Sequence, residues 1–401
     1  MSHSTTRTTA ALGEAARDPV PAIAGIPAAS AAPIAERARP AAGRFAPVAW
    51  ARANLFSGWL STAVTLALIY VIARWAIGFF DWAVLHAVWT VPQTDAGPDA
   101  SACRDAKGVG ACWAMVGDKY RFILFGRYTY EEQWRPAIVI ALFIGLYAVS
   151  AMRRFWRKEL LLIWIVALTA IGVLMWGGVL GLEYVPQDSW GGLPITLILS
   201  TFGLALAFPL AVLVALGRRS TELPAVKVLC VLYVELIRGV PLITLLFMAS
   251  VMFPLFMPEG FNLDKLLRAQ VAIILFAGAY LAEVVRGGLQ SLPRGQYEAA
   301  DALGLSYWKK TGLIVLPQAL RLVIPPLVNT FIGFFKDTSL VLIIGIFDLL
   351  TAGKVAITDP VWQAYSTELY LVLAAIYFAF CFVMSRYSHG LEQEFRRTAR
   401  R

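Results

Sequence analysis

Long apolar runs separated by short polar loops dominate the chain. About 20 consecutive apolar residues suffice for a helix to cross the ~30 Å hydrocarbon layer of a bilayer. The short apolar segment Ser339–Leu350 cannot cross as a helix, so we expect it to be re-entrant or interfacial. Eight longer runs are predicted to span the membrane, namely residues 57–80, 136–152, 160–182, 195–216, 228–252, 269–285, 318–335 and 369–385. The pattern therefore predicts an all-α polytopic membrane protein.

The composition supports this class. Of the 401 residues, 59% are hydrophobic and 15% are charged, whereas soluble domains average about 45–50% apolar and about 25% charged residues. Ordinary soluble, disordered and disulfide-scaffold proteins are thereby excluded. The net charge of +9 has two possible explanations. Either the excess of Lys and Arg forms a nucleic-acid-binding patch, or it lies in the loops on one side of the membrane.

Loop charges decide between these explanations and predict the orientation. The two termini and the loops on their side carry 22 basic and nine acidic residues, and the opposite loops carry nine basic and fourteen acidic residues. An excess of Lys and Arg marks the cytoplasmic side. We therefore expect both termini in the cytoplasm, and nucleic-acid binding is not needed to explain the charge.

The density of spans changes near residue 190, which suggests four segments. We expect a disordered cytoplasmic tail, an N-terminal extension of three spans with a large outer loop at 91–135, a core with a cytoplasmic loop at 286–316, and a short cytoplasmic tail. These segments are predicted at 1–54, 55–190, 191–390 and 391–401. Prolines and glycines interrupt the core spans, and neighbouring helices must satisfy the carbonyls that they free.

The loop at 286–316 carries a spaced motif. Its specified positions are Glu298, Ala299, Ala300, Gly304, Ile314, Leu316 and Pro317. The residues from Glu298 onward favour a short helix, Gly304 suits a turn at its C-terminus, and Pro317 suits the start of the next helix. Small alanines on one face would let this helix seat in a groove of a soluble partner. The alternative is an ordinary amphipathic helix that lies on the membrane.

This spacing matches, at every specified position, the EAA-x3-G-x9-I-x-L-P signature of permease subunits in ABC importers. Over roughly residues 190–395 the chain resembles the polar amino-acid branch of that family, in segments such as YVELIRGVPLITLLF at 233–247 and FKDTSLVLIIGIFDLL at 335–350. The N-terminal half, with ACW at 111–113, is similar to a permease of the general L-amino acid importer, which carries a three-span extension.

The resemblance implies a type I importer core of five helices in the bacterial inner membrane. It also implies a second, homologous permease subunit, a cytoplasmic ABC ATPase dimer docked on the motif loop, and a periplasmic amino-acid-binding protein, with membrane lipid around the spans. The chain contains no phosphate-binding G-x4-G-K-[S/T] loop, so we expect ATP and Mg²⁺ at the partner ATPase and no cofactor bound by this chain.

Charges within the predicted spans mark a candidate substrate path. Glu235 and Arg238 would lie about 12 and 16 Å deep in a straight fifth span, and Gly239 and Pro241 would break that helix. Buried charges in a membrane are paired or line a polar cavity. The two residues would therefore pair with each other or bind the charged groups of a zwitterionic substrate.

Two further pairs near span ends have alternative roles. Lys336 and Asp337 would line an outer gate, or Lys336 would reach the headgroups. Glu283 and Arg286 favour a structural or interfacial role.

The four cysteines divide into two kinds. Cys103 and Cys112 lie in the predicted outer loop, where an oxidising periplasm favours a disulfide, and Cys230 and Cys381 lie in spans. The outer loop itself would contact the binding protein or merely cover the added spans.

Two rival classes predict different sequences. A secondary transporter driven by an ion gradient predicts inverted repeats and buried carboxylates, but we find no convincing repeat and only Glu235 near the middle of the bilayer. A membrane-embedded enzyme requires clustered catalytic residues, yet no H-E-x-x-H or G-x-S-x-G motif occurs, and three scattered histidines offer no metal site. We therefore expect neither catalytic nor metal-binding residues in this chain.

Overall fold

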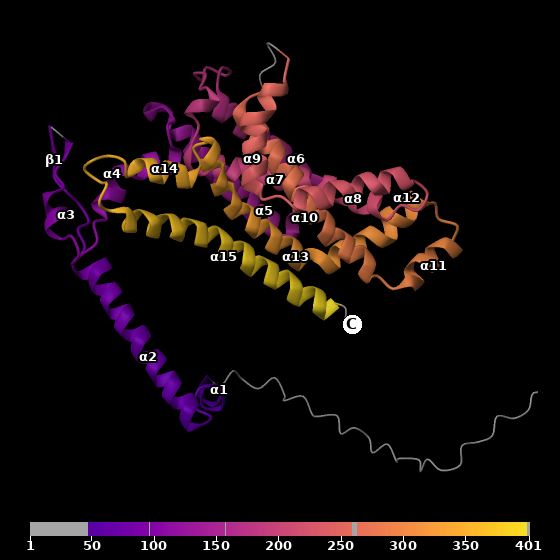
Figure 1. Cartoon of the computed structure of the whole chain (residues 1–401), viewed down its shortest axis with the longest axis horizontal. Helices are drawn as coiled ribbons and strands as arrows, with labels where there is room; N and C mark the ends of the chain where they lie inside the picture. Colours follow the sequence, from indigo (N-terminus) through magenta and orange to yellow (C-terminus); the bar gives the residue numbers. More distant parts are fainter. Residues whose placement is uncertain (1–46, 96, 157, 259–262, 399–401) are drawn as a thin grey trace, which may run out of the picture. The chain divides into compact units, whose positions relative to one another are not determined.

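The computed structural model describes residues 47–398, except 96, 157 and 259–262. Fifteen α-helices and a two-stranded antiparallel sheet occur in this part of the chain (Figure 1). The strands are β1 (Gln93–Thr94) and β2 (Gly97–Pro98). The helices are α1 (Pro47–Asn54), α2 (Trp59–Phe80), α3 (Ser101–Asp105), α4 (Ala114–Phe125), α5 (Trp134–Ala151), α6 (Lys158–Trp176), α7 (Gly192–Arg218), α8 (Pro224–Arg238), α9 (Leu242–Phe247), α10 (Lys265–Ser291), α11 (Arg294–Ala302), α12 (Tyr307–Lys310), α13 (Leu316–Asp337), α14 (Leu349–Ala356) and α15 (Ser366–Thr398).

The described residues form two compact parts, which divide after Ala76. In the first part, the expected disordered tail lies outside the described residues up to position 46, but residues 47–54 form α1. The prediction is wrong for these eight residues. Pro47 has the fixed φ angle that suits the first helical position, and two alanines favour the helix that follows.

The described residues contain seven helices that are long and apolar enough to cross a membrane, or eight if a bent pair counts as one span. The prediction of about eight spans is therefore confirmed in this sense. The bent pair is the predicted fifth span, where α8 and the helical segment Leu242–Phe256 meet at 101°. Gly239 ends α8 and Pro241 precedes α9, so the expected break does occur.

The other end of the chain also differs from expectation. Residues 391–398 of the predicted cytoplasmic tail continue α15, which is 33 residues long. Charged and polar residues follow the apolar part of α15, and Gly390 among them does not end the helix.

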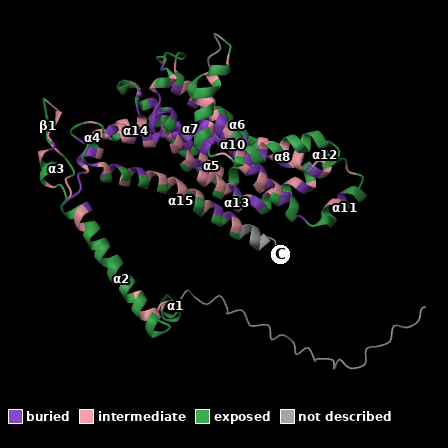
Figure 2. Cartoon of the chain, in the orientation of Figure 1, coloured by how far each residue is buried: buried purple, intermediate pink, exposed green. Residues whose placement is uncertain are grey.

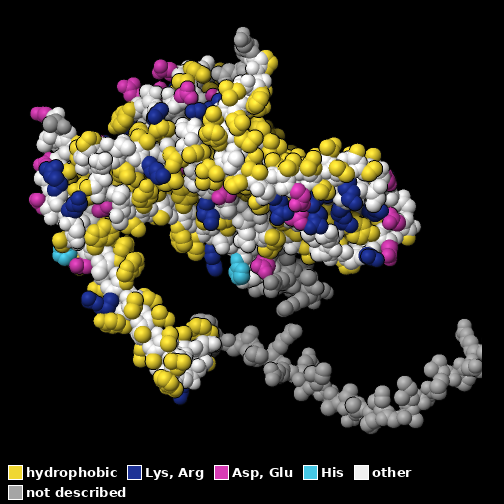
Figure 3. Space-filling model, viewed as in Figure 1, with side chains coloured by type: hydrophobic (Ala, Val, Ile, Leu, Met, Phe, Trp, Pro, Cys, Tyr) yellow, Lys and Arg dark blue, Asp and Glu magenta, His cyan; other side chains and the backbone are white. Residues whose placement is uncertain are grey.

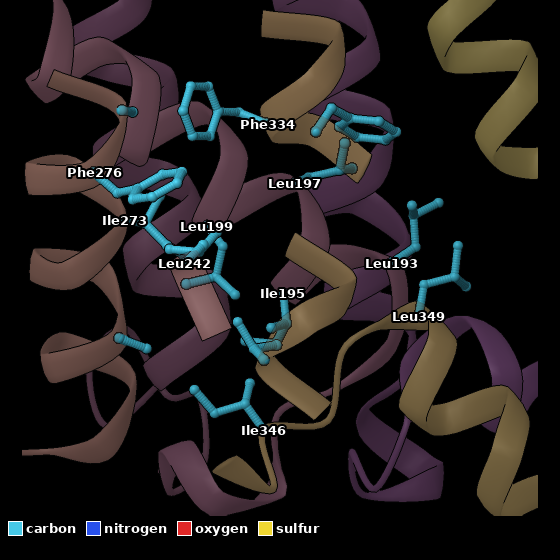
Figure 4. Close-up of a cluster of buried hydrophobic side chains, with 14 of the residues drawn as sticks. Leu193, Ile195, Leu197, Leu199, Leu242, Ile273, Phe276, Phe334, Ile346 and Leu349 are labelled. Atoms are coloured by element: carbon cyan, nitrogen blue, oxygen red, sulfur yellow. The ribbon is translucent and has the colours of Figure 1, made fainter. Parts of the chain in front are cut away.

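Small residues allow the central helices α7 and α10 to pack closely. A Cβ added at Gly203 would lie 2.8 Å from the side chain of Ile273, and Ala207, Ala211 and Ala277 are fully buried. In lipid, where hydrophobicity gives little drive for helix association, such close packing supplies much of the attraction. Ile273 and Phe276 of α10 join Leu199 of α7 and Phe334 of α13 in one apolar cluster (Figure 4).

No structural boundary at residue 190 divides the second part of the chain. Three glycines at the crossing of α4 and α7, namely Gly126, Gly191 and Gly192, bring the two backbones so close that a Cβ on any of them would lie within 3.0 Å of the other segment. Helix α4 also packs against α14, and α5 packs against α7. The predicted extension is therefore partly built into the core, because buried contacts cross the expected boundary.

The short apolar segment Ser339–Leu350 does not form a further long helix. Residues Thr338–Ile344 are a 3₁₀-helix, which Gly345 ends in a left-handed conformation (φ 72°). The Asp348 carboxylate then caps α14 by accepting hydrogen bonds from the main-chain N–H groups of Leu350 and Thr351. The Thr196 hydroxyl of α7 accepts another from the N–H of Leu349, at 3.1 Å.

Candidate functional site

The predicted motif begins on α11, which ends where Gly304 was expected to form a turn. Gly304 has φ 67°, a left-handed conformation that non-glycine residues rarely adopt. Its N–H donates to the carbonyl of Asp301 at 2.9 Å, and the N–H of Leu305 donates to the carbonyl of Ala300 at 3.2 Å. This pair of bonds is a standard helix C-terminus that requires a residue such as glycine at this position.

Polar contacts attach α11 to the ends of three other helices. The Tyr297 hydroxyl donates to the carbonyl of Leu289, and Arg219, just after α7, donates to the same hydroxyl, both at 2.8 Å. The side chains of Gln318 in α13 and Gln296 are joined by a hydrogen bond of 3.0 Å. These hydrogen bonds connect α11 directly to the ends of α7, α10 and α13.

The outer surface of α11 and the following turn is free to receive another molecule within the described structure. Glu298 and Ala299 are exposed, whereas Ala300 is buried against the loop. Beyond the helix, Leu303 and Trp308 are 75% and 72% exposed. Large apolar side chains beside an exposed carboxylate are typical of a protein-binding surface.

The last three motif positions lead into α13. Ile314 lies in the single π-helical turn Thr311–Val315, and Leu316 and Pro317 begin α13. Pro317 stands where the π-helical turn passes into α13, within the helical stretch Tyr307–Ile344.

The charged residues of α8 do not pair with each other. Instead, Arg218 at the end of α7 donates to Glu235 at 3.1 Å and to Glu283 at 2.8 Å. Arg238 and Arg286 also face the Glu283 carboxylate, Arg238 at 3.8 Å. These five residues form an ion-pair cluster. On the surface of this end of the molecule, Figure 3 shows basic and acidic side chains mixed over α8, α11 and α12. The cluster includes the i,i+3 pair predicted at Glu283 and Arg286.

The straight fifth span on which the depth of Glu235 and Arg238 was predicted does not form. The helix bends by 101° after Arg238, so the rise along α8 does not convert into depth. Glu235 instead lies against Arg218, the last residue of α7, and its side chain is 62% exposed. Its contact with a substrate stays a prediction.

Lys336 and Asp337 form no ion pair among the described residues. They lie in the last turn of α13, where Lys336 is exposed and Asp337 is half-buried. Their role at a gate stays a prediction.

At the other end of α7, buried contacts secure loop 91–135. Cys103 and Cys112 are joined by a disulfide, and both are fully buried. The N–H of Cys112 donates to the buried Glu368 carboxylate in the first turn of α15, at 3.0 Å. Trp362, also fully buried, donates from its indole N–H to Asp118 of α4 at 2.8 Å.

Sequence reasoning missed most of these contacts. Glu368 lies 256 residues from Cys112, and Trp362 lies 244 residues from Asp118, so no spacing rule connects them. It also missed Arg135, which is fully buried and contacts Glu132 at 2.6 Å and the carbonyl of Glu183 at 2.7 Å. An arginine beside Pro136 at the start of an apolar run was the available signal.

Metal-binding chemistry has no support in the described residues. They contain no group of three His, Cys, Asp or Glu side chains that could hold a metal ion. The exposed motif surface on α11 and the ion-pair cluster beside it remain the most prominent candidates for function.

Comparison with known proteins identifies the family. Residues 207–397 match the model described as the binding-protein-dependent transport system inner membrane component. The chain is also 48% identical over 352 residues to the inner membrane amino-acid ABC transporter permease protein YhdY of Escherichia coli, covering 86% of this chain and 92% of that protein. This chain belongs to the ABC transporter permeases. The resemblance inferred from the motif is thus confirmed, and the secondary-transporter alternative is disfavoured.

Other relatives of this permease agree. It is 37% identical over 419 residues to the glutamate/glutamine/aspartate/asparagine transport system permease protein BztC of Rhodobacter capsulatus, covering 88% of this chain and 94% of that protein. The crystal structure of an amino acid ABC transporter with histidines matches 51% of this permease and 92% of that chain, at 30% identity and a TM-score of 0.45. The matches to YhdY and BztC cover 86% and 88% of this chain, so they extend beyond the family segment 207–397 into the N-terminal half.

Proposed function

We propose that this permease is the membrane subunit of an ATP-driven importer that moves L-amino acids from the periplasm to the cytoplasm. The names of its relatives support amino acids as the substrate class. The family description supports delivery of the substrate by a binding protein. A second permease subunit of related sequence completes the translocation path, in the bacterial inner membrane.

The exposed surface of α11 carries the proposal for energy coupling. An ABC ATPase dimer binds Mg²⁺ and ATP, and each permease seats its α11 in a groove of one ATPase subunit. Closure of the ATPase then shifts α11, and the bonds of Tyr297 and Gln318 carry this shift into α7, α10 and α13. Alternating access of the spans follows from that shift.

The length of α7 supports the proposed orientation. A helix of 27 residues is about 40 Å long, which is enough to cross a bilayer with its headgroups. Helix α4 packs against the first residue of α7, and Arg219, which bonds to Tyr297 of α11, follows the last residue of α7. Loop 91–135 and α11 therefore lie at opposite ends of α7. We assign α11 to the cytoplasm and loop 91–135 to the periplasm, in agreement with the loop charges, which also predict both termini in the cytoplasm.

Affinity purification of the tagged chain from gently solubilised membranes tests the proposal. We expect an ATPase and a second permease in the eluate. Glu298→Arg should reduce amino-acid uptake at least about tenfold, because a reversed charge at an interface costs several kcal/mol, while the second permease still co-elutes.

Glu222→Arg is the matched control, because Glu222 is an exposed acid in the neighbouring loop between α7 and α8. This variant should transport normally. A chain that elutes alone from several detergents would contradict the proposal, as would normal uptake by Glu298→Arg.

A further inference from the structure

Loop 91–135 and the adjoining turn form a hollow of about 580 Å³ beside α4. We call it the α4 hollow. Its walls include Trp89, Asp118, Tyr120, Arg121, Tyr130 and Gln133. The hollow is remote from α11, since these two regions lie at opposite ends of α7.

Arg121 is held in the wall of the hollow by neutral groups. Its Nε donates to the side-chain oxygen of Gln133 at 2.7 Å, and a terminal nitrogen donates to the carbonyl of Tyr130 at 3.1 Å. The guanidinium also lies 3.6 Å from the centre of the Tyr130 ring. Gln133 is itself buried and donates to the carbonyl of Tyr128. Arg121 is thus fixed in one position before any ligand arrives.

Among the described residues, no carboxylate pairs with Arg121. Two other basic residues of this region do have acidic partners, since Lys119 lies 2.8 Å from Asp359 and Arg135 lies 2.6 Å from Glu132. A guanidinium uses only part of its five N–H donors in the contacts described above. Its remaining donors suit a carboxylate, which it binds with paired, charge-assisted hydrogen bonds.

Exposed aromatic rings surround the mouth of the hollow. Trp89 is 59% exposed, Tyr120 is 50% exposed and Tyr130 is 66% exposed. Trp, Tyr and Arg are the residues that contribute most to binding at protein–protein interfaces. The mouth therefore has the chemistry of a protein contact around a single preorganised cation.

The same turn of α4 holds the segment that precedes α15. Asp118 accepts the indole hydrogen bond of Trp362, and Lys119 pairs with Asp359. A ligand bound at Arg121 thus contacts the α4 turn that fixes the start of a core helix.

We propose that the α4 hollow is a docking point for the periplasmic binding protein, and that an Asp or Glu side chain on the surface of that protein pairs with Arg121. The inference rests on the proposed function, which places this loop in the periplasm and supplies the partner. The unpaired guanidinium provides the charge complementarity, and the exposed rings cover the apolar part of the contact.

The test measures the affinity of the purified binding protein for the whole transporter in lipid nanodiscs. Arg121→Met should weaken this affinity at least about tenfold and flatten its dependence on salt. Arg121→Lys keeps the positive charge but not the planar guanidinium that donates paired hydrogen bonds, so it should give an intermediate loss of affinity. Arg104→Met is the matched control, because Arg104 is an exposed cation of α3 outside the hollow. It should bind as the unaltered transporter does.

The outcomes separate the two proposals. If the unaltered transporter binds the protein and Arg121→Met binds it equally well, the docking point is wrong while the proposed function stands. If the unaltered transporter does not bind the protein at all, the proposed function fails first. If free amino acids alone bind to the transporter in an Arg121-dependent way, the carboxylate comes from the substrate and the docking proposal is overturned.

Discussion

Two loops at opposite ends of α7 contrast in how they are held. Loop 286–316 is fixed by a few polar contacts and leaves Leu303 and Trp308 exposed. Loop 91–135 is secured by a buried disulfide, a buried carboxylate and the fully buried Trp362. Figure 2 shows α11 as largely exposed. The difference separates an exposed surface from a buried scaffold that holds the start of α15.

The disulfide offers the largest test of this contrast. The double substitution Cys103→Ala and Cys112→Ala should lower the free energy of unfolding by about 2–3 kcal/mol. The reason is that the small loop closed by the disulfide regains its conformational freedom in the unfolded chain. Intrinsic tryptophan fluorescence during heating measures the change. The main-chain bond from residue 112 to Glu368 is retained in this variant.

Cys230→Ala with Cys381→Ala is the matched control, because these two cysteines are free and only partly buried. It removes the same two sulfur atoms without breaking a bridge, so a smaller loss is expected. Equal midpoints for the bridged and control variants would show that the disulfide does not support the scaffold.

The contrast also explains how much the sequence could predict. The motif positions lie in one continuous segment of the sequence, so the helix, its glycine turn and the following proline could all be predicted from local spacing. The number of spans also followed from hydrophobicity, because the backbone must satisfy its own hydrogen bonds in lipid.

Long-range contacts could not be predicted in the same way. The bond between Cys112 and Glu368 and the shared use of Arg218 by Glu235 and Glu283 depend on how helices pack. The straight fifth span was wrong for a related reason, since Gly239 and Pro241 indicated a break but not its angle. Pairing rules along one helix therefore favoured Glu235 with Arg238, although the structure assigns other partners.

One glycine within α11 and one just after it provide a test of intermediate size in loop 286–316. Gly304→Ala should destabilise the C-terminus of α11 by about 1–2 kcal/mol, because an alanine at φ 67° meets a left-handed strain. Gly295→Ala should stabilise the same helix by up to about 1 kcal/mol, since it has open space around it. Amide hydrogen exchange in α11 should be faster in the first variant and slower in the second, and the same direction in both would refute the assigned turn.

The smallest expected effect concerns the ion pair that links α4 to the segment before α15. The Lys119 hydrogen bond lowers the pKa of Asp359 below its usual 3.8. Burial alone would lower the pKa of Lys119, but its bond to Asp359 and the charge of Asp118 raise it above 10.5. The stabilisation is therefore present between these limits, and it is lost as the pH falls through the pKa of Asp359 or rises through that of Lys119.

Asp359→Asn should remove this acid dependence while changing stability near neutral pH by no more than about 1 kcal/mol, the usual range for partly exposed pairs. The measurement is the difference in thermal midpoint between neutral pH and a pH below 3.8. Asp105→Asn is the control, because Asp105 is an exposed acid of α3 with no ion pair in the described structure. If both variants keep the full acid response, the pair does not help to hold α4 against the segment before α15, and Trp362 with Glu368 must do so.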